Sequence, residues 1–232
     1  MTSDKLKRDA AHAALAYVKP GMRLGLGSGS TANHFIDAVA AKIKSGMELL
    51  CVPTSESTRR RAETLGIPLS SLDETPLLDL TVDGADEIDA SLRLIKGGGG
   101  AHLREKIVAT SSRQMIVIAD ASKRVSTLGA FPLPIEIVRF GATSTLGKIE
   151  TAARWAGCQG PLTLRMTNGA LFVTDNGNLI CDGSFDQIED PEKLATALSS
   201  VPGVVDHGLF IAIASLAIIA TSSGIETLER QP

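Results

Sequence analysis

Residues 22–44 read MRLGLGSGSTANHFIDAVAAKIK, and this stretch indicates the class of fold. Met22 to Gly27 has the character of a short buried strand, and it runs directly into a Gly/Ser loop. Thr31 to Lys44 has helical periodicity, with Ser30 or Thr31 as the expected N-cap. A strand, a glycine-rich loop and a helix in this order are typical of α/β proteins with parallel sheets.

The same alternation of strands and helices occupies the first part of the chain. Further strands are expected at Leu49–Pro53, Leu77–Val82 and Met115–Ala119, and helices at Asp4–Val18, Ser55–Leu65 and Ala101–Ser111. The pattern predicts an α/β fold with a Rossmann-like, doubly wound and mostly parallel sheet. We expect this domain to comprise residues 1–129 and 205–232, because apolar C-terminal strands are available to rejoin the sheet.

The pattern changes after Phe131-Pro132-Leu133-Pro134. Expected strands are Ile135–Val138, Leu162–Met166 paired with Ala170–Thr174, and Asn178–Cys181, and expected helices are Ser144–Trp155 and Pro191–Ser199. Residues 130–204 therefore predict a smaller α+β domain.

Composition excludes several classes of protein. The formal net charge is −3 and aromatic residues make up 3% of the chain, which argues against nucleic-acid binding. The longest apolar stretch, Leu209 to Ala220, is well short of the ~20 residues that a bilayer requires, and the N-terminus lacks a signal-peptide core. Three widely spaced cysteines without a CxxC motif argue against zinc and favour a reducing cytoplasm.

Gly25-Leu26-Gly27-Ser28-Gly29-Ser30-Thr31 is the first candidate site. It follows a strand and begins a helix, so backbone N–H groups and the helix dipole would face an incoming anion. The glycine spacing matches neither GxGxxG nor GxxxxGK[ST]. The segment predicts a phosphate-binding loop, and the alternative is a glycine-rich turn without a ligand.

Asp83-Gly84-Ala85-Asp86-Glu87-Ile88-Asp89 is the second candidate, at the carboxyl end of an apolar strand. Ligands of open α/β sheets bind at that edge. The spacing does not fit an EF-hand, because Ala85 and Ile88 occupy positions that need a ligand and a glycine. A magnesium site and a solvated acidic turn are the alternatives.

Two further segments carry lysines. Lys96-Gly97-Gly98-Gly99-Gly100 is followed by a helix with Glu105 in its first turn or so, and Asp120-Ala121-Ser122-Lys123 follows the strand at Met115–Ala119. Four consecutive glycines are entropically costly and leave open N–H donors. A solvated helix face around Glu105 and a surface position for Lys123 are the alternatives.

Together the four segments, all expected at carboxyl ends of strands, combine an anion loop with carboxylates and lysines. The histidines at 12, 34, 102 and 207 are scattered and lack metal-ligand spacing. The set suits proton transfer on a small phosphorylated carbonyl compound, which needs a base and donors for an enediolate.

The chain resembles the type A ribose-5-phosphate isomerases in collinear blocks over nearly its whole length. These blocks are GLGSGST at 25–31, DGADEID at 83–89, KGGGGA at 96–101, LREKIVA at 103–109, ADASK at 119–123, FPLPIEI at 131–137, VTDNGN at 173–178 and VPGVVDHGLF at 201–210. The departures are Ser28 in place of a common threonine, His102 after the glycines, and an apolar Phe210–Thr221.

The resemblance implies interconversion of D-ribose 5-phosphate and D-ribulose 5-phosphate in the non-oxidative pentose phosphate pathway, by a cytoplasmic homodimer or homotetramer without metal or organic cofactor. Glu105 would be the proton-transferring base. Asp83 and Asp86 would contact sugar hydroxyls, and Lys96 and Lys123 would orient the substrate and stabilise negative charge. The implied substrate-binding residues are Ser28, Gly29, Ser30, Thr31, Gly84, Ala85, Gly97, Gly98 and Gly99.

Two other classes of protein stay open. A sugar-phosphate sensing domain would share the phosphate loop but would not need Glu105 and Lys123, and no basic helix-turn-helix accompanies it. A Rossmann dehydrogenase is disfavoured by the glycine spacing, and Glu56 lies past the second strand rather than at its tip.

Overall fold

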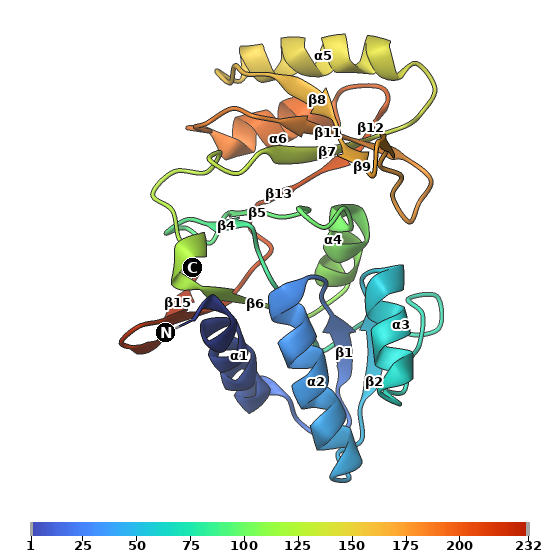
Figure 1. Ribbon diagram of the computed structural model, residues 1–232, viewed down its shortest axis with the longest axis vertical. Helices are drawn as coiled ribbons and strands as arrows, with labels where there is room; N and C mark the ends of the chain where they lie inside the picture. The colour runs from blue at the N-terminus through green and yellow to red at the C-terminus, as the bar shows by residue number, and fades with distance from the viewer. Residues whose placement is uncertain (1, 231–232) are drawn as a thin grey trace. The chain divides into compact units, whose positions relative to one another are not determined.

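The structure, a computed structural model, describes residues 2–230 and contains two compact units (Figure 1). The first unit comprises residues 2–85, 104–124 and 212–230, and the second comprises residues 86–103 and 125–211. The domain limits expected from the sequence stay a prediction. They are 1–129 together with 205–232 for one domain, and 130–204 for the other. The units differ from those limits most at residues 86–103, which group with the second unit.

The first unit contains a six-stranded sheet and four helices. Its strands are β1 (Arg23–Leu26), β2 (Leu50–Pro53), β3 (Leu80–Asp83), β6 (Met115–Asp120), β14 (Leu216–Thr221) and β15 (Gly224–Glu229). Its helices are α1 (Ser3–Ala14), α2 (Ser30–Lys44), α3 (Glu56–Thr64) and, from Arg104 onward, α4 (His102–Thr110), with 3₁₀ helices η1 (Leu15–Tyr17) and η2 (Ala121–Lys123).

The strand order is β15-β14-β6-β3-β1-β2, and every pair is parallel except the β14–β15 hairpin. The predicted doubly wound, mostly parallel sheet is confirmed. The chain leaves β1 for β2 on one side, whereas β3 pairs with β1 on the other. The carboxyl ends of β1 and β3 therefore flank a topological switch point, where ligands of such sheets bind.

Helices cover both faces of this sheet. On one face, Leu24 and Leu26 of β1 pack in a core with Phe35 and Ile36 of α2 and with the alanines of α1. On the other face, Val108 of α4 packs with Val52 of β2 and with Leu78. Because β14 lies between β6 and β15, its residues Leu216–Ala220 are all buried, which accounts for the apolar C-terminal segment.

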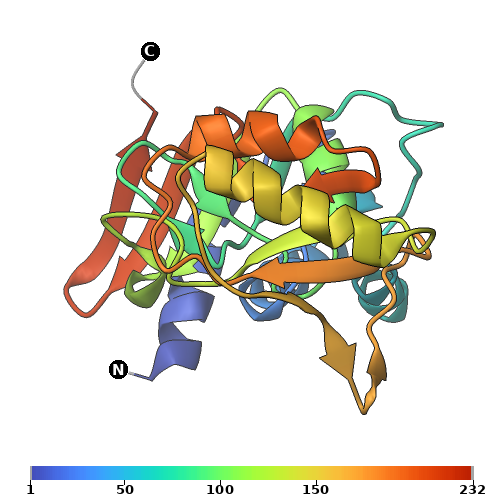
Figure 2. The same cartoon turned by 90° about the horizontal axis from the view of Figure 1, so that it is seen from above.

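The second unit is built on a β-α-β-β-α-β succession. Its main elements are β7 (Leu133–Ile137), α5 (Ala142–Trp155), β8 (Leu162–Leu164), β11 (Leu179–Gly183), α6 (Pro191–Ser199) and β12 (Val204–His207). The antiparallel order β12-β7-β11-β8 is that of a ferredoxin-like fold. α5 and α6 lie side by side (Figure 2) and bury Ile149 and Leu194 in one core with Ile135 of β7.

Two smaller sheets complete the second unit. β13 (Leu209–Phe210), β5 (Leu94–Ile95) and β4 (Glu87–Ile88) form a three-stranded antiparallel sheet, and β9 (Met166–Thr167) pairs with β10 (Ala170–Leu171). The predicted pairing of Leu162–Met166 with Ala170–Thr174 is wrong for β8, which pairs with β11 instead. Only the residues next to the turn form the predicted hairpin.

Candidate functional site

The glycine-rich loop after β1 leads straight into α2, as predicted. The N-cap residue is Gly29, with φ +99° and no side-chain cap, so the predicted caps Ser30 and Thr31 are wrong. A glycine satisfies the positive φ but supplies no side-chain acceptor. The side chain of the N-cap residue therefore accepts none of the first N–H groups of α2. Such N–H groups are the donors that an anion site at a helix N-terminus uses.

Ser28 is turned toward the protein. Its backbone N–H donates to Asp83 Oδ1 at 2.9 Å, and its hydroxyl donates to Ser55 Oγ at 2.7 Å. The hydroxyls of Thr54 and Thr58 also contact Ser28 Oγ, at 2.8 and 3.1 Å. Ser28 therefore braces the loop against the start of α3, whereas Ser30 is exposed and Thr31 is half-buried.

A lysine that the sequence analysis did not single out lies at the same loop. Lys7 Nζ, from α1, donates to Ser30 Oγ at 3.1 Å. Its positive charge lies at the N-terminus of α2, which is the positive end of the helix dipole. The lysine charge and the dipole both favour binding of an anion there. A lone lysine so far upstream of the loop carries no motif, so only the packing of α1 against α2 brings it here.

Asp83 ends β3 and is fully buried (0% exposed). Its Oδ1 accepts two backbone hydrogen bonds, from Ser28 N–H and, at 2.7 Å, from Gly84 N–H. Gly27 makes this approach feasible, since a Cβ there would lie 2.6 Å from Asp83 Cα and overlap Oδ1. The loop after β1 and the acid after β3 thus form one structure at the switch point.

Glu87 and Asp89, the last two of the four acids in the cluster, have structural partners. Glu87 accepts the N–H groups of Gly129 and Phe131 at 2.7 and 2.6 Å. Asp89 accepts Arg93 Nε at 2.6 Å and two backbone N–H groups. Within residues 2–230, no group of three or more His, Cys, Asp or Glu side chains is arranged to hold a metal ion.

Asp86 and the glycine run lie in the second unit. Asp86 Oδ2 accepts the N–H of Gly98 at 2.7 Å. Lys96 is buried, and its ammonium lies 5.4 Å from the centroid of the Phe210 ring. The glycines follow β5, so they extend from a strand of the three-stranded antiparallel sheet and not from a strand of the parallel sheet. Neighbouring strands here are only two residues long and carry no alternation to reveal them.

Glu105 and Lys123 belong to the first unit. Glu105 is in the first turn of α4 and is only 4% exposed, so the alternative of a solvated helix face is wrong for this carboxylate. Its neighbour Arg104 does form a surface-type pair, with Glu56 at 2.9 Å. Lys123 ends η2 directly after β6, and Asp120 caps that turn by accepting the N–H of Ser122.

The first unit therefore gathers loop 28–31, Asp83, Gly84 and Lys123 around the carboxyl ends of β1, β3 and β6. The second unit gathers Asp86, Lys96 and the glycines Gly97, Gly98 and Gly99. The three cysteines are buried and free, and burial raises the pKa of Cys51 and of Cys181 to about 12. No helix within residues 2–230 has the length and apolar character to cross a membrane.

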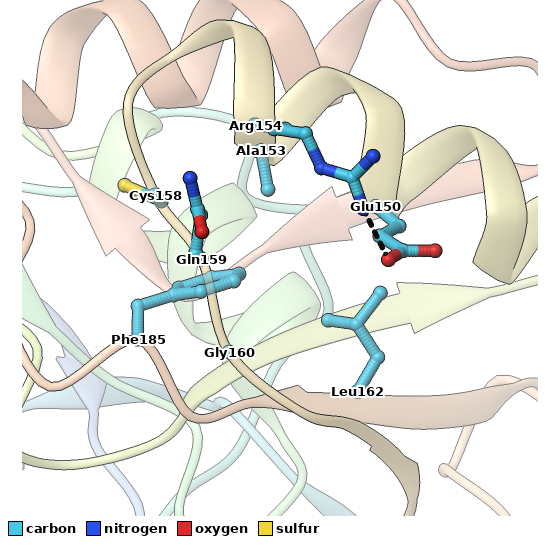
Figure 3. Close-up of a pocket in the computed structure, with 8 residues that line it drawn as sticks. All are labelled: Glu150, Ala153, Arg154, Cys158, Gln159, Gly160, Leu162 and Phe185. Carbon is cyan, nitrogen blue, oxygen red and sulfur yellow. Dashed lines mark hydrogen bonds and ion pairs between the residues drawn. The ribbon is translucent and has the colours of Figure 1, made fainter.

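A separate pocket in the second unit contains none of the predicted site residues. Figure 3 shows it at the end of α5, where Phe185 and Leu162 face the exposed Arg154–Glu150 ion pair of 2.6 Å. Its volume of about 160 Å³ is below the ~300–1,000 Å³ usual for small-molecule sites. We assign no ligand to it.

An anion loop at the switch point of a doubly wound sheet, beside a buried acid, defines the class as an α/β protein that binds small anionic ligands. Comparison with known proteins narrows this class. Residues 50–224 match the model of the family "Ribose 5-phosphate isomerase A (phosphoriboisomerase A)". The chain is 56% identical to ribose-5-phosphate isomerase A of Parvibaculum lavamentivorans over 99% of this chain and 100% of that protein.

Solved structures of ribose 5-phosphate isomerases are similar to this chain over nearly its full length. Ribose 5-phosphate isomerase from Plasmodium falciparum is 39% identical, with a TM-score of 0.93 over 99% of this chain and 100% of the other. A D-ribose-5-phosphate isomerase in complex with phospho-erythronic acid is 36% identical, with a TM-score of 0.91 and the same coverage. This chain belongs to the ribose 5-phosphate isomerase A family.

Proposed function

We propose that this chain interconverts D-ribose 5-phosphate and D-ribulose 5-phosphate through an enediolate, as a step of the pentose phosphate pathway. The observation that carries the proposal is the burial of Glu105, a carboxylate 4% exposed in the first turn of α4. Burying a carboxylate costs free energy, so a buried glutamate beside the carboxyl ends of the parallel strands is a candidate for a chemical role. Aldose–ketose isomerisation needs one such base.

The reaction moves one hydrogen between adjacent carbons. In the ring-opened aldose, Glu105 takes the proton from C2, and the electron pair of that C–H bond forms the C1–C2 double bond of the enediolate. The carbonyl oxygen at C1 becomes the oxyanion. Return of the proton to C1, with transfer of the hydroxyl proton at C2 to the oxyanion at C1, gives the ketose. No electrons leave the substrate, so the reaction requires no redox cofactor, and we propose none.

The phosphate of the substrate would bind at Gly29, Ser30 and Thr31. Supporting this are the uncapped start of α2 and the contact of Lys7 with Ser30 Oγ. Charge-assisted hydrogen bonds from N–H, hydroxyl and ammonium groups are the ones that hold phosphate strongly. Ser28 would support the loop from inside, because its N–H and hydroxyl are both used in protein contacts.

The sugar would be held by Asp83, Gly84, Ala85 and Asp86. Lys96, Lys123 and the N–H groups of Gly97, Gly98 and Gly99 would stabilise the enediolate. Fixed positive groups placed where charge develops are the strongest single contribution to many enzymatic rates. The relative solved in complex with phospho-erythronic acid supports an enediolate-like ligand, because a phosphorylated sugar acid presents a planar anionic group.

We infer further that the protein is cytoplasmic and acts as a homodimer or homotetramer. The free, buried cysteines support a reducing compartment. Purified protein should be mixed with ribose 5-phosphate, and ribulose 5-phosphate should be measured by a ketose-specific assay. Ketose formation at an enzymatic rate is the expected result. Binding of ribose 5-phosphate without ketose formation would favour a sensing domain, and nicotinamide-dependent turnover would favour a dehydrogenase.

A further inference from the structure

Arg165, at the junction of β8 and β9, contacts the glycine run of the second unit. Its Nη1 donates to the carbonyl oxygens of Gly97 and Gly98 at 2.9 and 3.1 Å. Its Nε and Nη2 donate to the two carboxylate oxygens of Asp182 at 2.8 and 2.5 Å. The Arg165 side chain is only 15% exposed, so this is a mostly desolvated arrangement rather than a surface pair.

The contact with Gly97 has a geometric consequence. The carbonyl of Gly97 and the N–H of Gly98 belong to one trans peptide unit, so they point in opposite directions. Arg165 holds the carbonyl, and Asp86 Oδ2 accepts the N–H at 2.7 Å. The orientation of the peptide plane is therefore fixed at two opposite edges, with a guanidinium at the carbonyl edge and a carboxylate at the N–H edge.

The packing around Gly98 leaves this peptide little freedom. A Cβ at Gly98 would lie 2.7 Å from Asp86 Oδ1 and 3.0 Å from Phe131 Cζ. The guanidinium of Arg165 is itself restrained, because its Cζ lies 5.8 Å from the centroid of the Phe172 ring while Asp182 binds its other edge. A positive charge at the carbonyl also polarises the amide, which strengthens the N–H as a donor to Asp86.

We propose that Arg165 is a positioning residue for the isomerase reaction. Arg165 acts on Asp86 through the Gly97–Gly98 peptide. This inference rests on the proposed function, in which Asp86 contacts the sugar. Arg165 itself does not touch the substrate in this scheme. It keeps the glycine run in the one conformation that presents the Gly98 N–H to Asp86, and so keeps Asp86 in its binding geometry.

The competing explanation is a purely structural ion pair. Arg165 and Asp182 lie on adjacent segments of one sheet, where the backbone N–H of Arg165 also donates to Ile180 O at 2.8 Å. If that were its whole role, loss of Arg165 would lower stability and leave the catalytic parameters of the folded protein unchanged. The two explanations therefore differ in kinetics, not in the melting temperature.

Four variants test the inference: Arg165→Met, Asp86→Ala, the double variant, and the control Arg154→Met. Arg154 suits as a control because its ion pair with Glu150 is exposed and on α5. We expect Arg165→Met to lower kcat/KM by about 10-fold or more, and Arg154→Met to leave it within about twofold. In the Asp86→Ala background, Arg165→Met should cost less than about threefold, because the group it positions is gone.

Equal fold-losses in the two backgrounds, or a kcat/KM for Arg165→Met within twofold of the parent, would overturn the inference. Arg165→Lys covers the case in which Arg165→Met does not fold. An ammonium keeps the positive charge. It cannot donate to both carboxylate oxygens of Asp182 and also reach the carbonyls of Gly97 and Gly98. It should still lose most of the kcat/KM, and full rescue by lysine would also overturn the inference. An inactive parent protein would instead refute the proposed function.

Discussion

The backbone N–H of Ser28 donates to Oδ1 of Asp83 at 2.9 Å, and this bond joins the loop after β1 to the acid that ends β3. The two strands flank the switch point of the sheet. In the proposed function, one residue supports the phosphate loop and the other contacts the sugar. A change that separates β1 from β3 at this edge would therefore disturb both parts of the site together.

Gly27→Ala makes that change with one methyl group. The added Cβ would overlap Asp83 Oδ1 and lie 2.6 Å from its Cα, so the two strand ends must move apart. We expect a loss of about 1–3 kcal/mol in the free energy of unfolding, the usual cost of overpacking. Urea denaturation and KM for ribose 5-phosphate are the measurements, and KM should rise.

Gly147→Ala is the matched control, because Gly147 lies within α5 and, apart from its chain neighbours and the backbone of that helix, no atom of residues 2–230 would lie within 4 Å of its Cβ. There the same methyl group should be neutral or should stabilise the helix by up to about 1 kcal/mol. Equal effects of the two substitutions would contradict the close approach at Gly27.

Thr31→Val tests the phosphate loop. It removes one hydroxyl donor to a charged group and keeps the shape of the side chain, so binding should weaken by roughly 1–3 kcal/mol. Inorganic phosphate and sulfate should compete with substrate. Thr151→Val, on α5, is a control for the loss of a helical threonine hydroxyl. Normal binding by Thr31→Val, together with no inhibition by either anion, would place the phosphate elsewhere.

Glu105→Gln tests the base. Glutamine keeps the size and hydrogen-bonding reach of the side chain but cannot accept the proton, so kcat should fall by at least ~10²–10⁴ while KM stays within a few-fold. The variant should also stop exchanging the C2 hydrogen with deuterated solvent. Glu192→Gln, in the first turn of α6, is the matched control and should keep full turnover. Near-normal exchange by Glu105→Gln would assign the base to another residue, with Asp83 the next candidate.

Removal of metal ions should leave the activity unchanged. Glu87 and Asp89 are occupied by backbone N–H groups and by Arg93, so the acidic cluster does not converge on one point. Exhaustive chelation followed by assay in metal-free buffer is the measurement. Loss of most of the activity, with recovery on addition of magnesium or manganese, would show that the acidic cluster binds a metal.

The elements that the sequence predicted well have strong local signals. Helix α6 was expected at Pro191–Ser199 and has those bounds, because Asp190 caps it and proline occupies its first position. The two-residue strands β4, β5 and β13 were not predicted, since so short a segment has no periodicity. Without these strands, the sequence did not reveal that the glycine run follows a strand of a separate antiparallel sheet.

The residues of the candidate site also divide into those with a local sequence signal and those without one. Glycine-rich and acidic motifs adjacent to strong strands, such as loop 28–31 and Asp83, could be located at the sheet edge from sequence. Lys7 could not, because its proximity to Ser30 depends on how two helices pack. Arg165 could not either, since its partners are distant in sequence and two of them are backbone carbonyls.

Trp155 is the one tryptophan of the chain, and it ends α5 in the second unit. Its side chain is 65% exposed, with the ammonium of Lys193 4.6 Å from the ring centroid. Indole fluorescence excited selectively at long wavelength therefore comes only from the ferredoxin-like unit, whereas the far-ultraviolet circular dichroism comes from both units. Two denaturation curves recorded with these signals on the same sample coincide if the units unfold as one cooperative block, and they separate if each unit melts on its own.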